Sequence, residues 1–557
     1  MFLFDFFRSF LPLANPLGFG ASDFVLLAMA ILLAGGVVLW RIWLEPRAAA
    51  FAGRTGWCMI FLAALPVVLR MALLPHHPVP SPDIYDEFSH LLAADTLRHL
   101  RLANPPHPLH QFFETQFVLQ EPKYSSIYPP GQGLVLAVGW TLFGHPWAGV
   151  VLAVAAFCAL CYWMLRAWTT PGWALAGGVL AVIEFGPLSQ WMNSYWGGAA
   201  AAAAGCLVFG SLPRLVTAAR PRDAALLGLG IAAHLLIRPY ESAFLLLSVA
   251  AFLAPAKPLH LRKLAPAAAL PILAAGLMLL QNRQVTGSWT TLPYVLSQYQ
   301  YGVPAALTFQ SNPVPHRELN REQELNYRMQ MSFGGSSFWQ RLEYRVRFYR
   351  FFFLAPLYLA LPAFFWALRQ YRFWWAALTV ALFALGANFF PNFEPHYLAG
   401  VTCLFVLVSV VGLQQIARLS REAAGLLVLL CVAQFVFWYG MHVFDTQAFS
   451  LAIRQYETWN ALNHRNPAMR IVVNEQIAAI PARVLVFVRY YPQHIFQQEW
   501  VYNAADIDGS RVVWARDLGP QENEKLQSYY RDRSAWLLEP DFRPPRLRPY
   551  PATPHPQ

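Results

Sequence analysis

Charged residues are few for a chain of this length. Only 13% of the 557 residues are Asp, Glu, Lys or Arg, whereas about a quarter of a typical soluble domain is charged. So few charged side chains cannot cover the surface of a globule this large, which argues against a soluble protein. Hydrophobic residues make up 57% of the chain, and runs such as 24–40 and 426–441 approach the roughly 20 residues that cross a bilayer. We therefore predict a polytopic α-helical membrane protein.

Three other features are missing, and each absence argues against a class of protein. No glycine-rich phosphate loop is present, so a cytoplasmic nucleotide-sugar or ATP site has no support. No internal repeat of the kind found in many transporters is visible. The six cysteines all lie in apolar segments, and the Cys158–Cys161 pair lacks the surroundings of a redox or zinc site. We interpret the cysteines as small residues of a membrane core.

Basic residues outnumber acidic ones, and their placement predicts an orientation. The net charge is +11, and the arginines fall between apolar runs. This pattern indicates cytoplasmic loops near anionic headgroups and argues against nucleic acid as a partner. The segments predicted to face outward are 76–127, 189–195, 284–349, 391–395 and 444–557.

Apolar segments recur along most of the chain. Their approximate limits are 22–44, 55–75, 128–144, 147–166, 171–188, 196–213, 222–237, 241–256, 264–283, 350–368, 373–390, 396–416 and 422–443. Three of them separate residue 127 from residue 189, although both residues should lie outside. One of the three therefore cannot be a full crossing, and we suspect 128–144, the shortest, which begins with Pro-Pro-Gly. About 12–13 membrane helices are expected.

The predicted organisation is a membrane domain (1–445), a small soluble α/β domain (446–540) and a Pro-rich tail (541–557) that is extended or disordered. In the soluble domain a polar, amphipathic stretch at 519–533 predicts a helix. Runs of β-branched and aromatic residues predict three strands, at 483–490, 511–517 and 534–541.

Acidic residues are scarce, yet three lie within 83–87, near the start of a helix predicted to begin at Ser81. Asp83 would then fall in the first turn, where the helix dipole favours a negative charge. Asp86 and Glu87 would lie beyond that turn, and His90 can share their face. These side chains form either a solvated helix face or part of a site.

Two further motifs mix polar and aromatic residues at predicted outer boundaries. In "EPKYSSIYPPGQG", Lys123 and Tyr128 suit either phosphate and sugar binding or interfacial anchoring. In "WMNSYWGG", Asn193, Tyr195 and Trp196 suit either sugar stacking and hydrogen bonding or an aromatic belt.

The last two motifs carry charge. In "LLIRPYES", Arg238 lies at the outer end of a membrane segment and needs a partner, which is either Glu241 or a bound phosphate. Tyr240 lies beside it. The short turn "PNFEPHYLAG" needs only its Pro and Asn to form, so its other polar side chains favour a site role: Glu394, His396 and Tyr397.

An Asp-Glu pair in "YDEF", followed by "YPPG" in a chain with many spans, resembles the GT-C membrane glycosyltransferases. These include protein mannosyltransferases and aminoarabinose transferases, and the resemblance to bacterial members covers residues 76–440. It implies an enzyme that takes a sugar from a polyprenyl-phosphate donor outside the membrane and usually inverts the anomeric centre. The chain departs from the best-known members in having two apolar segments before the acidic loop.

The resemblance maps the catalytic carboxylates onto Asp86, as base, and Glu87, which supports it or holds a metal. An acceptor hydroxyl must lose a proton, and the leaving phosphate needs cations, for which Arg238 and Lys123 are candidates. The other expected donor contacts are His396 and Tyr128. The expected sugar or acceptor contacts are Asn193, Tyr195, Trp196, Tyr240, Glu394 and Tyr397. Family members differ in their need for a metal, and the ligands for Mg²⁺ or Mn²⁺ would be Asp86, Glu87 and Glu394.

The expected function is an inverting, polyprenyl-phosphate-sugar-dependent glycosyltransferase, a multi-pass protein of the bacterial inner membrane with its site facing the periplasm. Its partners would be a lipid-linked sugar, membrane lipids and a glycan, lipid or protein acceptor. Two alternatives remain open: a polytopic transporter, and a non-catalytic scaffold of a surface-polysaccharide system in which the soluble domain binds.

Overall fold

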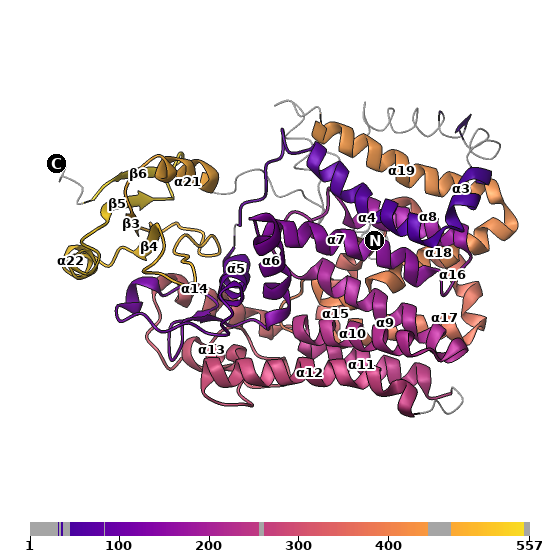
Figure 1. Ribbon diagram of the computed structural model, residues 1–557, viewed down its shortest axis with the longest axis horizontal. Helices are drawn as coiled ribbons and strands as arrows, with labels where there is room; N and C mark the ends of the chain where they lie inside the picture. Colours follow the sequence, from indigo (N-terminus) through magenta and orange to yellow (C-terminus); the bar gives the residue numbers. More distant parts are fainter. Residues whose placement is uncertain are drawn as a thin grey trace.

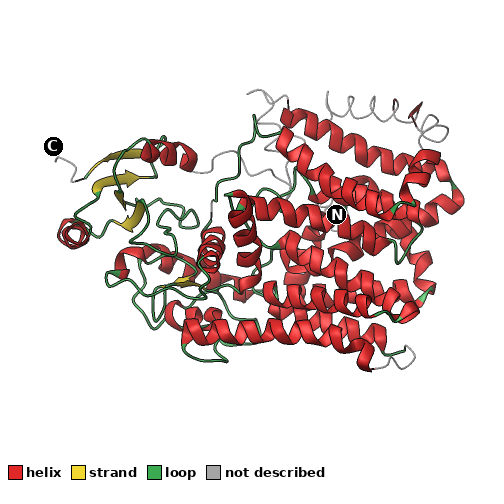
Figure 2. Ribbon diagram, viewed as in Figure 1, coloured by secondary structure: helices red, strands yellow, loops and turns green. Residues whose placement is uncertain are grey.

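Helices form most of the described chain, loops form most of the rest, and a small sheet lies near the C-terminus (Figure 2). The computed structural model describes residues 45–82, 84–255, 261–443 and 469–550, together with Leu32, Gly35 and Gly36. Apart from those three residues, the predicted apolar segment 22–44 lies outside the described residues. In Figure 1 the helices form a bundle, and the sheet lies beyond its left end.

Apart from the first, which lies between the predicted segments 22–44 and 55–75, the bundle helices follow the predicted apolar segments closely. They are α3 (Glu45–Ala52), α4 (Thr55–Ala72), α7 (Trp147–Leu165), α8 (Pro171–Phe185), α9 (Gly198–Ala218), α10 (Pro221–Ile237), α11 (Pro239–Leu253), α12 (Leu261–Thr286), α17 (Tyr371–Ala387), α18 (Thr402–Leu419) and α19 (Arg421–Val443). Apolar residues fill the buried interior. Large apolar side chains such as Trp57, Ile60 and Leu273 also lie exposed on the outside, which suits lipid and not water.

Six helical stretches are long and apolar enough to cross a membrane. They are Thr55–Ala72, Trp147–Leu165, Gly198–Ala218, Ala265–Thr286, Pro395–Leu419 and Arg421–Gly440. Four apolar stretches are shorter, Pro171–Phe185, Pro239–Leu253, Ala355–Arg369 and Tyr371–Ala387. The predicted polytopic α-helical architecture is confirmed.

One predicted membrane segment, 350–368, is not a continuous α-helix. It is divided into η4 (Arg347–Phe352), η5 (Ala355–Leu359), α16 (Ala360–Phe364) and η6 (Phe365–Arg369). Pro356 and Pro362 lack the backbone donors that a regular helix needs, so the segment proceeds in short 3₁₀ and α turns.

The suspected re-entrant segment forms α6 (Pro130–Phe143), whose 14 residues span about 21 Å and fall short of a bilayer core. It packs beside α5 (Tyr85–Arg98), and Figure 1 shows the two helices lying across the left ends of the bundle helices. The helix that carries the acidic pair therefore lies at one end of the bundle.

The other long outward segments gather at the same end. The first contains η2 (His110–Phe113) and a short hairpin of β1 (Val118–Leu119) and β2 (Ser125–Ser126). The second contains α13 (Pro293–Tyr301), α14 (Arg321–Ser332), η3 (Phe333–Gly335) and α15 (Phe338–Val346). Figure 1 shows α5, α13, α14 and the sheet on this side.

The C-terminal α/β domain has the strand order β4-β3-β5-β6. The three predicted strands are confirmed as β3 (Val484–Val488), β4 (Val512–Arg516) and β5 (Ser534–Glu539), and the predicted helix as α22 (Pro520–Tyr529). Strand β3 is fully buried and pairs in parallel with β4 and β5, and α21 (Arg470–Ala478) precedes it. The sheet continues beyond residue 540, because β6 (Arg546–Pro549) pairs antiparallel with β5. Part of the predicted tail is thus an edge strand, and 551–557 lie outside the described residues.

The sheet shares a hydrophobic core with the first outward segment. Phe112 and Phe113, together with Leu92 of α5, pack against Leu485 and Phe487 of β3. Polar contacts reinforce this junction: the backbone N–H of Ala505 donates to Asp95 Oδ2 at 2.8 Å, and Tyr124 Oη donates to the carbonyl of Asn503 at 2.9 Å. The ring of Tyr502 lies 4.9 Å from that of Phe88, the residue that follows the acidic pair. The domain therefore covers the outer side of α5.

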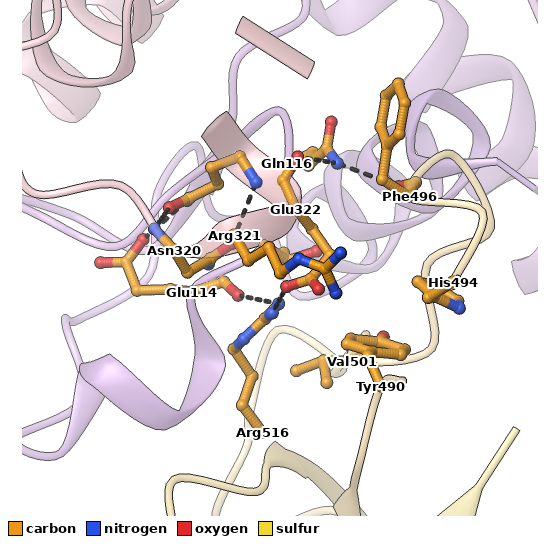
Figure 3. A network of polar contacts seen from close by, with 12 residues as sticks. Glu114, Gln116, Asn320, Arg321, Glu322, Tyr490, His494, Phe496, Val501 and Arg516 are labelled. Carbon is orange, nitrogen blue, oxygen red and sulfur yellow. Dashed lines mark hydrogen bonds and ion pairs between the residues drawn. The ribbon is translucent and has the colours of Figure 1, made fainter. Parts of the chain in front are cut away.

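Charged groups at the same junction are paired. Figure 3 shows Arg516 of β4 bridging to Glu322 of α14, with a second hydrogen bond of 3.4 Å to the carbonyl of Glu114. Gln116 donates to the carbonyls of Glu322, at 3.3 Å, and Phe496, at 3.0 Å. Two outward segments and the C-terminal domain are thus joined by one polar network.

Candidate active site

The acidic helix begins later than the sequence predicts. Its N-cap is Ile84 and its first residue is Tyr85, so the predicted start at Ser81 is wrong. Asp86 and Glu87 consequently lie in the first turn, where the helix dipole favours negative charge. Asp83 lies outside the described residues.

Glu87 supports the backbone. Its Oε2 accepts from the N–H of Ile84 at 3.4 Å, and its Oε1 accepts from the N–H of Tyr195 at 3.0 Å. The residue is only 3% exposed. Glu87 therefore caps α5 and ties it to the loop before α9.

Asp86 is held by Tyr128. Tyr128 Oη donates to Asp86 Oδ1, and the Tyr128 ring stacks on His90, with 4.2 Å between ring centroids. Burial raises the pKa of Asp86 to about 6, while the Tyr128 hydrogen bond and the charge of Arg238 act against the increase. Burial also lowers the pKa of His90 to about 3, with Arg238 adding to the effect. At neutral pH Asp86 is thus mainly a carboxylate beside a neutral imidazole.

Arg238 lies at the break between α10 and α11. Its backbone leaves the helical region, with φ −137° and ψ 73°, and Pro239 starts the next helix. The guanidinium carbon is 5.3 Å from the centre of the Tyr397 ring. Nε is buried without a hydrogen-bond partner, and Glu241 forms no ion pair with Arg238 in the part of the chain that the structure describes. The two partners expected for Arg238 are Glu241 and a bound phosphate. The ion pair with Glu241 does not form among the described residues.

The turn before α18 forms another side of the site. Arg345 of α15 donates to the carbonyl of Ala387 at 2.8 Å and to those of Pro391 and Asn392 at 3.1 Å each. This arginine fixes the turn whose next residue is Glu394. The N–H of Tyr397 donates to the carbonyl of Glu394 at 2.9 Å, in the 3₁₀ helix η7 (Pro395–Val401).

Glu394 and His396 extend from this turn toward the other elements. Burial raises the pKa of Glu394 to about 8; the charge of Asp86 adds to the increase, and that of Arg238 opposes it. These mutual effects show that the two acids and Arg238 share one region. The His396 ring lies 4.8 Å from the ring of Trp196, which brings the loop before α9 into the same group.

Helix α6 holds the two halves of the site together. A Cβ on Gly131 would lie 2.7 Å from the carbonyl atoms of Leu236, at the end of α10 just before Arg238. A Cβ on Gly133 would lie 2.9 Å from the Cβ of Ala93 in α5. Two glycines spaced by two therefore allow α6 to contact both α5 and α10. Each part of "YPPGQG" has a structural task, since Tyr128 binds Asp86 and Gln132 Nε2 donates to the carbonyl of Tyr195 at 2.8 Å.

Several buried polar atoms around this region have no hydrogen-bond partner among the described residues. They are Arg238 Nε, His90 Nδ1, Trp196 Nε1 and Glu241 Oε1. Leaving a buried polar atom unpaired costs about 1–3 kcal/mol, and native proteins leave few of them. The four atoms come from three segments, α5, the loop before α9 and the α10–α11 break, and they indicate a site that a polar ligand completes.

Other predicted site residues have structural partners. Asn193 is buried; its Oδ1 accepts from Arg70 Nε at 2.8 Å, and its Nδ2 donates to the carbonyl of Ser189 at 2.8 Å. Tyr195 is also buried, with Oη donating to the carbonyl of Pro80 at 2.8 Å. We assign both to the support of the loop and not to sugar contact.

Two further residues do not join the site directly. Lys123 is exposed in the turn between β1 and β2, and no contact with the Asp86 region is found for it in the described chain. Tyr240 Oη donates to the carbonyl of Gly386 at 3.1 Å, so its hydroxyl serves to join α11 to α17. The strongest candidates are thus Asp86, Tyr128, Trp196, Arg238, Glu394, His396 and Tyr397.

The proposed metal ligands do not converge. Glu87 uses both carboxylate oxygens on backbone N–H groups, and no group of three or more His, Cys, Asp or Glu suited to a metal occurs among the described residues. Asp86 and Glu394 alone do not make the oxygen-rich ligand set that Mg²⁺ or Mn²⁺ takes. We therefore derive no metal-dependent step.

Sequence reasoning missed Arg345 and Gln132. Both act through backbone carbonyls on distant segments, and nothing in their local sequence distinguishes them from ordinary loop and helix residues. His90 was placed on the face of Asp86, but its stacking on Tyr128 was not foreseen.

No protein-family model matches the sequence, and no curated protein matches it either. Among solved structures, ArnT from Cupriavidus metallidurans in the apo state is similar, with 12% identity and a TM-score of 0.50 over 87% of this chain and 93% of that one. The chain has a GT-C fold.

A solved structure of an oligosaccharyltransferase from Archaeoglobus fulgidus, tethered with an acceptor peptide, is also similar. Its identity is 11% and its TM-score 0.37, over 86% of this chain and 69% of that one. The GT-C fold predicted from "YDEF" and "YPPG" is confirmed, together with its C-terminal α/β region.

Proposed function

We propose that this GT-C protein transfers a sugar from a polyprenyl-phosphate donor to a hydroxyl group of an acceptor on the outer side of the bacterial inner membrane. The observation that carries the proposal is Arg238, a half-buried cation beside Asp86 with no carboxylate partner among the described residues. It lies at the end of a membrane helix, where the phosphate of a lipid donor would sit while its polyprenyl chain stays in the bilayer.

Arg238 supplies the charge that the leaving group needs. As the bond between the sugar and the phosphate breaks, a second negative charge develops on the phosphate, and a fixed guanidinium stabilises it. An arginine suits a phosphate because its N–H groups form paired hydrogen bonds. The unpartnered Nε of Arg238 supports this role.

Asp86 is the base. The acceptor hydroxyl loses its proton to Asp86 as its oxygen attacks the anomeric carbon, and the phosphate leaves from the opposite face. A carboxyl with a pKa of about 6 is ionised at neutral pH and still a better proton acceptor than an ordinary aspartate. Tyr128 orients it by donating to Oδ1. A single displacement of this kind inverts the anomeric centre.

Aromatic groups surround the remaining space. Trp196 and Tyr397 offer ring faces for a sugar, and His396 lies between them, with centroids 4.8 and 5.0 Å from theirs. The indole Nε1 of Trp196 is buried and unpartnered, so it is available to a sugar hydroxyl. His90, held neutral, can take part in hydrogen bonds without competing for the phosphate charge.

The test is turnover by the purified full-length protein in lipid. A panel of undecaprenyl-phosphate-linked sugars is incubated with it and with candidate acceptors, and released undecaprenyl phosphate is measured by mass spectrometry. We expect release from at least one donor by the wild type and a decrease of about 10²–10⁴-fold in Asp86→Asn, which keeps the shape of the side chain but cannot take the proton. Equal turnover by Asp86→Asn would refute the role of Asp86.

A further inference from the structure

A second carboxyl group, that of Glu394, belongs to the turn that carries Tyr397, the ring over which Arg238 lies, and the proposed mechanism leaves it without a role. Glu394 ends a turn that Arg345 fixes through backbone carbonyls, so its position does not depend on a side-chain partner of its own. Its carboxyl group has no hydrogen bond or ion pair to another side chain among the described residues, although Glu394 is more than half buried. Such a group is well placed but unused by the protein.

The number of charges near Glu394 determines whether its carboxyl group is protonated. Asp86 and Glu394 share one nearby cation, Arg238, and the donor's phosphodiester brings a further negative charge. Three anions around one guanidinium in a poorly solvated region are unfavourable, and protonation of one carboxyl group relieves the repulsion. Asp86 keeps its charge because Tyr128 donates to it. Glu394 lacks such a donor and is the group that takes up the proton.

We propose that Glu394 donates a proton to the departing phosphate oxygen while Asp86 accepts the proton of the acceptor hydroxyl. This inference rests on the proposed transfer reaction and assigns a second catalytic residue to it. The turn of Glu394 adjoins Tyr397, over whose ring Arg238 lies, so the acid and the cation belong to one part of the site.

The step balances in atoms and charge. The acceptor oxygen forms a bond to the anomeric carbon, and the bond from that carbon to the phosphate oxygen breaks with its electron pair going to oxygen. One proton moves from the acceptor hydroxyl to Asp86, and one moves from Glu394 to the phosphate oxygen. The product is a polyprenyl monophosphate monoanion, and a proton returned from Asp86 to Glu394 through water restores the enzyme.

The pKa values support the assignment of Glu394 as the acid and Asp86 as the base. That of Glu394 is raised to about 8 and that of Asp86 to about 6, and two carboxyl groups whose pKa values differ are suited to act as acid and base. Between these values Asp86 is ionised and Glu394 protonated. The rate should therefore decrease below about pH 6 as Asp86 gains a proton, and above about pH 8 as Glu394 loses one.

Other groups around Glu394 contribute to its environment. From the packed elements these are Tyr85, Asp86 and His90 of α5, Tyr128 before α6, Arg238 and Glu241 at the α10–α11 break, Tyr294 of α13, Arg345 and Tyr349 around α15, and His396 and Tyr397 of η7. Besides Asp86, the carboxyl group of this set close to Arg238 is that of Glu241, so Glu241 serves as the matched control.

The first measurement is the pH profile of kcat/KM for the full-length protein with an undecaprenyl-phosphate sugar that it turns over. In Glu394→Gln we expect a decrease in kcat of about 10²-fold near pH 7. We also expect loss of the alkaline limb of the profile, which is the decrease in kcat/KM above about pH 8, because an amide cannot release a proton. Glu394→Asp should recover part of the rate and the limb. Glu241→Gln should keep the alkaline limb. An unchanged limb in Glu394→Gln, or a limb lost only in Glu241→Gln, would overturn the assignment.

The second measurement does not need turnover. Farnesyl phosphate is titrated into the protein at pH 8.5 by calorimetry in buffers of different ionisation enthalpy. Binding of the anion should raise the pKa of Glu394 and cause uptake of a fraction of a proton, which Glu394→Gln abolishes and Glu241→Gln retains. Equal uptake in Glu394→Gln would count against the proposal. If the wild type binds farnesyl phosphate with this uptake but releases no polyprenyl phosphate from any donor, the transfer reaction is wrong while the phosphate-linked proton site stands.

Discussion

Two arginines in this protein illustrate opposite uses of the same side chain. Arg516, at the junction of the C-terminal domain, is paired with Glu322, bonds the carbonyl of Glu114 and lies over the ring of Tyr490 (Figure 3). Arg238, at the break between α10 and α11, contacts a ring but has an unpartnered Nε and no carboxylate partner among the described residues.

The difference between Arg516 and Arg238 separates an arginine that supports the fold from one that is available to a ligand. A buried ion pair that is complete within the protein fixes two segments relative to one another, and removing one member leaves the other charge buried and uncompensated. Arg238 forms no such ion pair among the described residues, so it does not join two segments in this way. Arg516 therefore should matter for stability, and Arg238 for the ligand.

The largest expected effect is on catalysis, at Arg238. Arg238→Gln should reduce transfer by about 10²–10³-fold, because the developing phosphate charge loses its fixed cation. Arg238→Lys should retain an intermediate rate, since it keeps the charge but not the forked geometry. Turnover of an undecaprenyl-phosphate donor measures this. Thermal unfolding of both variants should stay close to that of the wild type, and a large loss of stability would show that Arg238 is structural.

The next effect is on stability, at Arg516. Arg516→Gln leaves Glu322 buried without its partner, at a cost of about 3–5 kcal/mol to the docking of the C-terminal domain. Protease cleavage within residues 470–550 should become faster, while the affinity for farnesyl phosphate changes little.

The double variant Arg516→Gln with Glu322→Gln is the control for that pair. It removes both charges and should recover part of the protection against protease. If the single Arg516→Gln variant resists protease as well as the wild type does, the pair does not hold the domain.

The smallest effect is expected at Lys123, which the sequence suggested as a second phosphate cation. The side chain is exposed in the hairpin and does not reach the Asp86 region in the described chain. Lys123→Ala should therefore change transfer by no more than about twofold, the scale of an ordinary surface substitution. A loss comparable to that of Arg238→Gln would mean that the hairpin moves onto the donor.

Patterns that are local in the chain were predicted well from the sequence. Apolar runs located the bundle helices, β-branched runs located β3, β4 and β5, and the motifs "YDEF" and "YPPG" indicated the GT-C fold. Errors arose where prolines interrupted an apolar run, as at Pro356 and Pro362, and where a strand was made of Arg and Pro, as in β6.

The different partners of the two neighbouring acids, Asp86 and Glu87, could not be predicted from the sequence. Asp86 and Glu87 are neighbours, but a helix turns by about 100° per residue, so the two carboxyl groups face different segments. One meets Tyr128 and the other the backbone of Tyr195, more than 100 residues away. Whether an acid is free or used by the backbone depends on these distant partners.

The core that α5 shares with the C-terminal domain has a consequence for biosynthesis. Asp95 receives its hydrogen bond from Ala505, 410 residues later, and Leu92 packs against strands that follow the last membrane helix. During synthesis α5 leaves the ribosome long before these residues exist, so its outer side stays uncovered while the bundle inserts. Only a chain that has been translated to its last strands can close this core. A chain that ended before these strands would leave the apolar residues around Leu92 and Phe113 exposed to water.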